Sequence, residues 1–293
     1  MNPFSNSYTK DTSDKELIEL ILVGDKKSLS KLLERHQPFI YNLAWKMTGD
    51  PTLAEDLSQE AILKIITNIA SFRFESSFRT WAYRIVSNHF INDQTKSKRY
   101  FANNFDDLGR GLDQAASIEL NGEEQRIKAD EIKEIRLQCL SGMLLCLNRE
   151  QRLIYVMGEI FRADHNIGSE IMGISKANYR MKLSKARKDL YTFMQNKCGL
   201  VDKSNPCRCH KKVTVALENG FIDAKNLLFN KKEFSTFRES LEEDANYLVE
   251  ESLDVYAKIH RNTNFKTNFE KEQYIKNLFE SDNWKLKLNL NLN

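Results

Sequence analysis

The sequence has little proline and glycine, 4 and 11 of its 293 residues. Because these residues are typical of turns, their scarcity favours helices over a turn-rich β architecture. No run approaches the roughly 18 apolar residues of a membrane span, and the first residues lack the basic and then apolar pattern of a signal peptide. Five cysteines without such a signal favour a reducing compartment. We therefore predict an all-α, cytoplasmic protein with no membrane span.

Charge is unevenly distributed along the chain. The formal net charge is only +3, yet residues 71–100 carry +4, residues 174–190 carry +5, and residues 104–134 between them carry −5. Two basic blocks on an acidic tether indicate two modules that bind a polyanion such as nucleic acid. Charge alone leaves a second interpretation open, in which the blocks are solvated faces of ordinary helices.

Helical periodicity dominates the first part of the chain. Apolar residues recur at helical spacing over residues 14–49 and again over residues 54–69. Between these segments, Gly49 suits the left-handed conformation that ends a helix, Asp50 suits the cap of the next helix, and Pro51 suits its first turn. The spacing therefore predicts two helices with a sharp boundary at these three residues.

The second of these helices has a polar face. Asp56, Gln59 and Glu60 are spaced at i, i+3 and i+4, so they lie on the same side of the helix. Leu57 and Ile65 belong to the apolar face that the same helix presents to a core. The pattern predicts an exposed patch with two carboxylates and one amide.

The first basic block interleaves aromatic residues with arginine around a serine-rich loop at residues 71–77. Aromatic rings stack on unpaired bases and arginine neutralises phosphate, which together capture single-stranded nucleic acid. Taken singly, each aromatic residue fits the core of a helical bundle better than a binding surface. The combination of loop, charge and order favours nucleic-acid capture.

The second basic block predicts a helix-turn-helix. Residues 165–190 show a short helix, a turn at residues 173–175, and a basic helix that closes near Asn196. A recognition helix presents its N-terminal residues to a major groove. The predicted DNA-contacting residues are Ser175, Lys176, Asn178, Tyr179, Arg180, Lys182, Lys185 and Arg187. A plain helical hairpin remains the alternative interpretation.

Long, ordered signatures lie in the first block. Residues 32–93, which include "AEDLSQE" and "FRTWAYRIVSN", resemble the first conserved domain of bacterial RNA polymerase sigma factors. The helix-turn-helix resembles the second sigma domain, and no extra domain separates the two. The chain is therefore similar to the extracytoplasmic-function (ECF) group, in a subgroup with a cysteine-containing C-terminal extension.

This resemblance implies a non-enzymatic initiation factor that binds core RNA polymerase, recognises promoter elements and promotes DNA melting. It implies that Asp56, Gln59 and Glu60 contact the clamp helices of the β′ subunit, and that the segment before the helix-turn-helix meets the β flap. It also implies a set of contacts to the single-stranded minus-ten element: Arg73, Phe74, Glu75, Ser76, Ser77, Trp81, Arg84 and Asn88. The recognition helix would bind the minus-thirty-five element, and an anti-sigma factor is a further expected partner.

The predicted architecture has two small helical domains, a region 2 bundle and a region 4 helix-turn-helix. The boundaries are residues 1–13 for a disordered lead-in, 14–102 for region 2, 103–125 for an acidic linker, 126–197 for region 4, 198–213 for a cysteine-containing segment and 214–293 for a mostly helical extension. In the extension, an apolar stripe predicts a helix over about residues 231–260 that needs a partner surface.

The cysteine-containing segment has three interpretations. Cys198, Cys207, Cys209 and His210 offer four ligands for zinc, although one residue between two cysteines is tighter than the usual spacing of zinc sites. A redox-sensing thiol pair and a plain structural turn are the alternatives, and we expect no cofactor other than this zinc. Two rival functions stay open: a stand-alone helix-turn-helix regulator, and a metal-dependent enzyme built on these cysteines.

Overall fold

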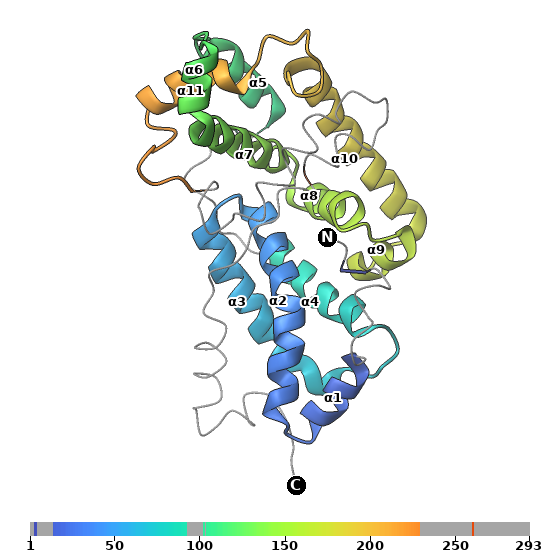
Figure 1. Cartoon of the computed structure of the whole chain (residues 1–293). Coiled ribbons are helices and arrows are strands. Elements are labelled where there is room, and N and C mark those ends of the chain that lie inside the picture. The colour runs from blue at the N-terminus through green and yellow to red at the C-terminus, as the bar shows by residue number, and fades with distance from the viewer. Residues whose placement is uncertain (1–2, 5–13, 93–101, 103, 229–259, 261–293) are drawn as a thin grey trace.

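The computed structural model describes residues 3–4, 14–92, 102, 104–228 and 260. Within this part of the chain every regular element is helical, which confirms the all-α prediction (Figure 1). The elements are α1 (Asp14–Leu22), α2 (Lys26–Thr48), α3 (Pro51–Asn68), the 3₁₀ turn η2 (Ile69–Ser71), α4 (Phe78–Asn92), α5 (Phe105–Gln114), α6 (Gly122–Ile127), α7 (Ala129–Leu145), α8 (Arg149–Tyr155), the π-helical turn η3 (Val156–Ile160), α9 (His165–Met172), α10 (Lys176–Lys197) and α11 (Cys209–Glu218).

The helix boundaries follow the capping residues seen in the sequence. Gly49 adopts a left-handed conformation with φ of 63° at the end of α2. The Asp50 carboxylate then accepts hydrogen bonds from the backbone N–H groups of Thr52 (2.9 Å) and Leu53 (3.1 Å), and Pro51 opens α3. Such caps satisfy N–H groups that have no partner inside the helix.

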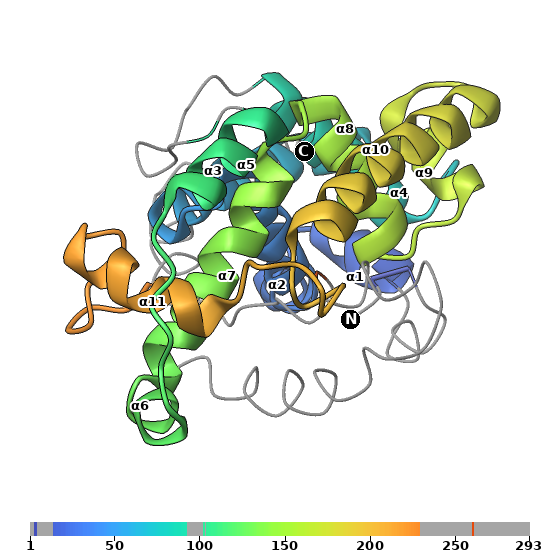
Figure 2. The same cartoon turned by 90° about the horizontal axis from the view of Figure 1, so that it is seen from above.

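Two groups of helices divide the molecule. Helices α1 to α4 make the lower body in Figure 1, in which α2 packs along α3, and Trp45 and Tyr83 are fully buried. Helices α5 to α11 make the upper part. From above, α6 and α11 lie at one end of this upper part, and α9 and α10 lie at the other (Figure 2).

The two groups share one continuous hydrophobic core. Phe161, which follows η3, makes edge-to-face contacts with Phe39 of α2 (6.3 Å between ring centroids) and Tyr83 of α4 (6.2 Å). Helix α4 packs against α9, and α2 contacts both α7 and α8. The sequence predicted two modules on a tether, whereas in this structure the modules pack together.

Several segment boundaries predicted from the sequence differ from the helix boundaries in the structure. Residues 103–125, expected as a linker, contain all of α5 and the start of α6. Residues 3 and 4, expected in a disordered lead-in, lie against α4, where the Phe4 and Tyr83 ring centroids are 5.3 Å apart. Helix α11 crosses the expected boundary at residue 213. The helix predicted over about residues 231–260 lies outside the described residues, except for His260.

Candidate nucleic-acid interface

The polar face predicted on α3 is exposed. Asp56 and Glu60 are exposed and Gln59 is half-buried, while Leu57 lies in the core on the opposite side. Glu60 Oε2 lies 3.3 Å from Nε2 of His89, which comes from α4. The face is therefore a carboxylate-bearing surface at the α3–α4 edge of the lower body.

An aromatic cluster supports the loop before α4. Phe72 and Phe78 are buried, with ring centroids 5.8 Å apart, and Trp81 lies 5.3 Å from Phe72. Phe74 is 39% exposed and packs on the same cluster, 4.8 Å from Phe72. The Lys15 ammonium lies 5.8 Å from the centre of the Phe74 ring. Most aromatic residues that the structure describes in the first basic block are thus core, and among them Phe74 and the half-buried Trp81 reach the surface.

The loop itself has an unusual backbone at Phe74. This residue has φ of 59°, in the left-handed region that side chains with a Cβ rarely adopt. The conformation places a large apolar ring at the loop surface between the exposed side chains of Arg73 and Glu75. Such strain persists only where surrounding structure holds it, and it occurs often at binding sites.

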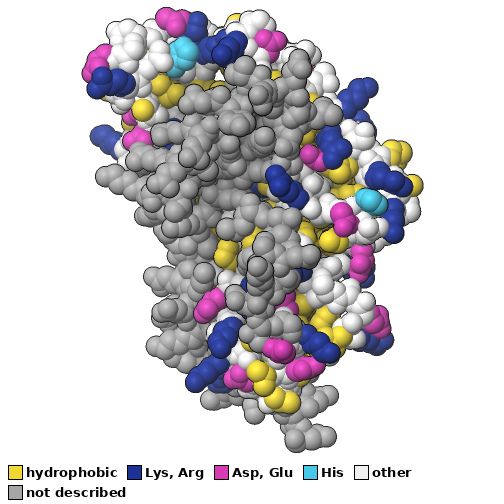
Figure 3. Space-filling model, turned by 45° about the vertical axis from the view of Figure 1, so that its right-hand side comes forward, with side chains coloured by type: hydrophobic (Ala, Val, Ile, Leu, Met, Phe, Trp, Pro, Cys, Tyr) yellow, Lys and Arg dark blue, Asp and Glu magenta, His cyan; other side chains and the backbone are white. Residues whose placement is uncertain are grey.

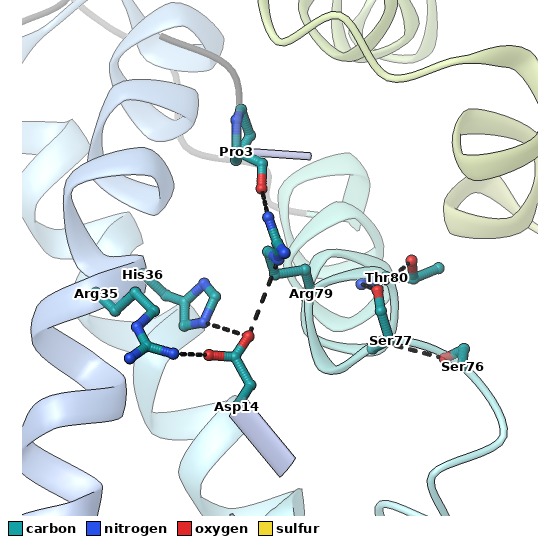
Figure 4. A network of polar contacts seen from close by, with 8 residues as sticks. All are labelled: Pro3, Asp14, Arg35, His36, Ser76, Ser77, Arg79 and Thr80. Atoms are coloured by element: carbon teal, nitrogen blue, oxygen red, sulfur yellow. Dashed lines mark hydrogen bonds and ion pairs between the residues drawn. The ribbon is translucent and has the colours of Figure 1, made fainter. Parts of the chain in front are cut away.

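Ser77 fixes the start of α4. Its hydroxyl oxygen accepts a hydrogen bond from the Thr80 backbone N–H (3.1 Å) and lies 2.9 Å from the Thr80 hydroxyl (Figure 4). This is the geometry of a helix N-cap. The Ser77 side chain, predicted to touch DNA, is therefore also the cap that sets the direction of the loop.

Behind the loop, a polar network joins three helices. The Asp14 carboxylate pairs with Arg35 of α2 (2.5 Å), with His36 (3.2 Å) and with Arg79 of α4 (3.9 Å) (Figure 4). Arg79 also donates to the Pro3 carbonyl. The network ties the first turn of α4 to α1, to α2 and to the N-terminal residues.

Protonation within the network follows from burial and charge. Burial alone would raise the pKa of Asp14, but hydrogen bonds and the charges of His36 and Arg35 hold it below its ordinary value. Burial lowers the pKa of His36 even though Asp14 favours its protonated form. Sequence reasoning missed this network. Arg79 appears in the basic block as one more surface arginine, and nothing in the pattern marks it as buried.

Arg84 takes part in the contact between the two helix groups. Its Nε and Nη2 donate to the Glu170 carbonyl at the end of α9 (3.0 and 2.7 Å), and Nη2 lies 3.9 Å from the Glu170 carboxylate. Asn88, one turn further along α4, is exposed. In this arrangement Arg84, which is predicted to bind the minus-ten element, contacts the first helix of the helix-turn-helix.

The predicted helix-turn-helix is present as α9, a turn at Gly173 and α10. Gly173 has φ of 64°, and the Ser175 hydroxyl accepts from the Asn178 backbone N–H (3.2 Å). Lys176 and Arg180 are exposed on the first turns of α10, and Asn178 is half-buried. The N-terminal end of α10 therefore presents two cations to solvent.

The basic residues further along α10 are paired within their own module. Lys182 binds Glu150 (2.6 Å), Lys185 lies 3.1 Å from Asp189, and the Arg187 Nε donates to the Glu159 carboxylate (2.7 Å). Figure 3 shows Lys and Arg interspersed with acidic side chains over the side where α9 and α10 lie. These three cations have acidic partners, so the first turns of α10 are better placed to meet phosphate.

Tyr179 is not a surface residue, which corrects its prediction as a DNA contact. Its side chain is fully buried with Ile154 and Leu183 in the core of the helix-turn-helix. The ring lies so close to the backbone of α9 that a Cβ added at Gly168 would be 2.2 Å from it. Tyr179 thus sets the packing of α9 on α10.

We expect Gly168→Ala to destabilise the helix-turn-helix by about 1–3 kcal/mol, because the added methyl group overlaps the Tyr179 ring. Thermal unfolding measures the effect as a lower Tm. Gly111→Ala is the matched control: it lies inside α5 with nothing within 4 Å of the added atom, so it should keep or raise the Tm. Equal behaviour of the two variants would contradict the packing described for Tyr179.

The four candidate zinc ligands do not form a metal site. In the described part of the chain, no group of three or more His, Cys, Asp or Glu side chains is placed to hold a metal ion. His210 lies 3.4 Å from the Glu119 carboxylate, and all five cysteines are free thiols. Cys198 and Cys207 instead face each other in an isolated parallel β-bridge. The geometry does not support the zinc interpretation.

Comparison with known proteins bears on the identity of the chain. The family model for sigma-70 region 2 matches residues 32–100, which include α3, the loop and α4. A probable RNA polymerase sigma factor of Haemophilus influenzae is 30% identical over 156 residues, which cover 50% of this chain and 78% of the relative. The ECF RNA polymerase sigma-E factor of Escherichia coli is 25% identical over 198 residues, 64% of this chain and 97% of the relative. The chain belongs to the ECF group of RNA polymerase sigma factors.

The family predicted from the sequence is therefore confirmed, and a stand-alone helix-turn-helix regulator is not favoured, since α2 to α4 match sigma-70 region 2. The subgroup with a cysteine-containing extension stays a prediction. The solved structure of CnrH in complex with the cytosolic domain of CnrY overlaps this sigma factor with a TM-score of 0.45 at 17% identity, covering 63% of this chain and 98% of that one. Among the described helices, none has the length and apolar character needed to cross a membrane.

Proposed function

We propose that this sigma factor binds core RNA polymerase through the acidic face of α3, captures an unpaired base of the minus-ten element at the loop of residues 72–77, and reads the minus-thirty-five element with the first turns of α10. The observation that carries the proposal is the exposed Phe74 ring, held above an aromatic cluster at the start of α4. Binding of the unpaired strand would drive promoter melting, and the protein would perform no covalent chemistry. It would act in the cytoplasm, where the polymerase works.

The loop has the chemistry that an unpaired base requires. Bases stack on aromatic faces, which contributes roughly 1–3 kcal/mol per base, and cations nearby neutralise phosphate. Phe74 and Trp81 supply ring surface, and Arg73 and Lys15 supply positive charge beside Phe74. Extruding a base from the duplex costs a few kcal/mol, so a site preformed for it favours the melted state.

The first turns of α10 have the chemistry of major-groove recognition. Lys176, Arg180 and Met181 are exposed there, and Met181 is 64% exposed. The N-terminal end of a helix carries partial positive charge that adds to the attraction for phosphate. Tyr179 and Leu183 on the opposite side hold the helix in its module.

In our proposal, the two modules separate when the protein binds core polymerase and promoter DNA. Arg84 donates to the Glu170 carbonyl in the packed arrangement, and in our proposal it exchanges this contact for the minus-ten strand when DNA binds. Core polymerase would favour the open arrangement by binding it more tightly than the packed one. An anti-sigma factor would do the reverse and favour the packed arrangement.

We expect Phe74→Ala to slow formation of the melted complex by roughly tenfold, because a stacking surface worth about 1–2 kcal/mol is lost. The full chain is reconstituted with core polymerase, a promoter is selected from a library, and melting is followed by 2-aminopurine fluorescence in the non-template strand. Phe221→Ala is the matched control, since Phe221 is 52% exposed but lies beyond α11.

The outcomes separate the parts of the proposal. If the wild-type chain directs no specific transcript, the proposed promoter function is wrong as a whole. Normal melting by Phe74→Ala, with Phe221→Ala also normal, would remove the loop as the base-binding site. A duplex-binding defect without a melting defect would place Phe74 outside the single-strand contact.

A further inference from the structure

The end of α10 and the start of α11 are joined by a backbone pairing between two cysteines. Cys198 ends α10 and pairs with Cys207 in a parallel β-bridge, with the Gly199 N–H donating to the Cys207 carbonyl (3.1 Å). Paired strands lie about 4.8 Å apart and their facing residues point to the same side. That spacing falls within the Cα separation of about 4.4–6.8 Å that a disulfide accepts.

The segment between the two cysteines is held in place by its own contacts. The Asp202 carboxylate accepts from the Ser204 N–H (2.8 Å), the Asn205 amide donates to the Gln195 carbonyl (2.8 Å), and Arg208 donates to the Gly199 carbonyl (2.9 Å). A Cβ at Gly199 would lie 2.4 Å from the Cys207 carbonyl oxygen, so glycine permits the close approach. The cysteine pair is therefore positioned by the fold before any bond forms.

The two thiols differ in access. Cys198 is buried and burial raises its pKa to about 11, whereas Cys207 is half-buried. Burial also raises the pKa of Cys207, and neighbouring Cys209 adds to this rise, while Lys212 and Arg208 oppose it. Both thiols are protonated at neutral pH, so they react slowly with dilute peroxide. Concentrated hydrogen peroxide or diamide can supply the two-electron oxidation, and Cys207 is the more accessible sulfur of the two.

We propose that Cys198 and Cys207 form a disulfide when a two-electron oxidant is present. This bond would link the end of the DNA-reading helix α10 to the start of α11. With hydrogen peroxide, the Cys207 sulfur attacks the O–O bond and becomes a sulfenic acid as one water leaves. The Cys198 sulfur then attacks the Cys207 sulfur, breaks its S–O bond, and the hydroxyl leaves with the Cys198 proton as a second water. Two thiols and one peroxide thus give one disulfide and two waters.

The disulfide would restrain the segment that connects the two modules. Helix α11 holds the segment after α5, because Lys212 donates to the Leu112 carbonyl (2.9 Å) and the Ile118 N–H donates to the Lys211 carbonyl (2.9 Å). Lys197, the last residue of α10, also binds Asp113 of α5 (2.6 Å). A bond between Cys198 and Cys207 therefore fixes the end of α10 to the chain that joins region 2 to region 4.

Trypsin separates the candidate cysteines into different peptides, which makes the pairing directly testable. Cys198 falls in residues 198–203, Cys207 in residues 204–208, Cys209 in residues 209–211, and Cys139 with Cys146 in residues 137–149. The purified full-length protein is treated with diamide, remaining thiols are alkylated, and the digest is analysed without reduction. We expect residues 198–203 linked to residues 204–208 as the major oxidised product, and a higher Tm that reductant reverses.

Variants decide between pairings. Cys209→Ser should keep the linked peptide, whereas Cys198→Ser and Cys207→Ser should lose it, with circular dichroism as the folding check for each variant. A major link from residues 204–208 to residues 209–211, or to residues 137–149, would overturn the proposal. So would full alkylation of both thiols after diamide treatment of the folded protein, or one zinc ion per chain that protects them.

Discussion

Replacing Asp56 and Glu60 of α3 by arginine should weaken binding to core RNA polymerase by roughly thirtyfold, about 2 kcal/mol. Both side chains are exposed and the helix packs through its opposite face, so the double variant should fold normally. The effect should come from charge reversal at a surface that, in our proposal, faces cations of the polymerase. Fluorescence anisotropy of the labelled sigma factor with core enzyme measures the affinity, and run-off transcription should fall in parallel.

The matched control is the same reversal at Glu16 and Glu19 of α1. These residues are also exposed and acidic, but they lie on a different helix. Their double replacement by arginine changes the net charge equally, so any general effect of charge appears there too. Equal affinities of the two double variants would remove the α3 face as the polymerase contact. A loss in both variants would indicate long-range charge attraction instead of a specific surface.

Local rules predicted the helices of this protein because their signals sit within a few residues of each other. Gly49 and Asp50 act through backbone geometry and hydrogen bonds to the next turn, and each has the predicted role. The acidic face of α3 follows equally from spacing along one helix.

Side-chain burial between distant segments could not be predicted in the same way. Tyr179 lies among cations in the sequence, and its burial depends on Gly168, which leaves room for the ring on the facing helix. Arg79 is one of several arginines in a basic block, and its contacts with the Asp14 carboxylate and the Pro3 carbonyl make it a structural residue. The two basic blocks predicted both modules, but they did not predict whether the modules pack together.

One buried guanidinium contributes to the contact between the modules. Arg152 of α8 donates to the carbonyls of Leu144 (2.9 Å), Leu145 (3.0 Å) and Leu147 (2.9 Å), and also to the Met47 carbonyl in the last turn of α2. It therefore supplies donors to carbonyls at the C-terminal end of α7 and ties α8 to α2. In the sequence it stands in an apolar helix where an arginine would be expected to face solvent.

We expect Arg152→Met to lower the free energy of unfolding by on the order of 4 kcal/mol, because several buried carbonyls lose their donor at once. Arg152→Lys should recover only a small part, since an ammonium group cannot reach carbonyls on both sides as the planar fork does. Arg126→Met, at an exposed position on α6, should stay within about 0.5 kcal/mol of wild type. Guanidinium chloride unfolding measures all three values. A loss below about 1 kcal/mol in Arg152→Met would contradict this role of the guanidinium, because it would mean that water satisfies the carbonyls in its place.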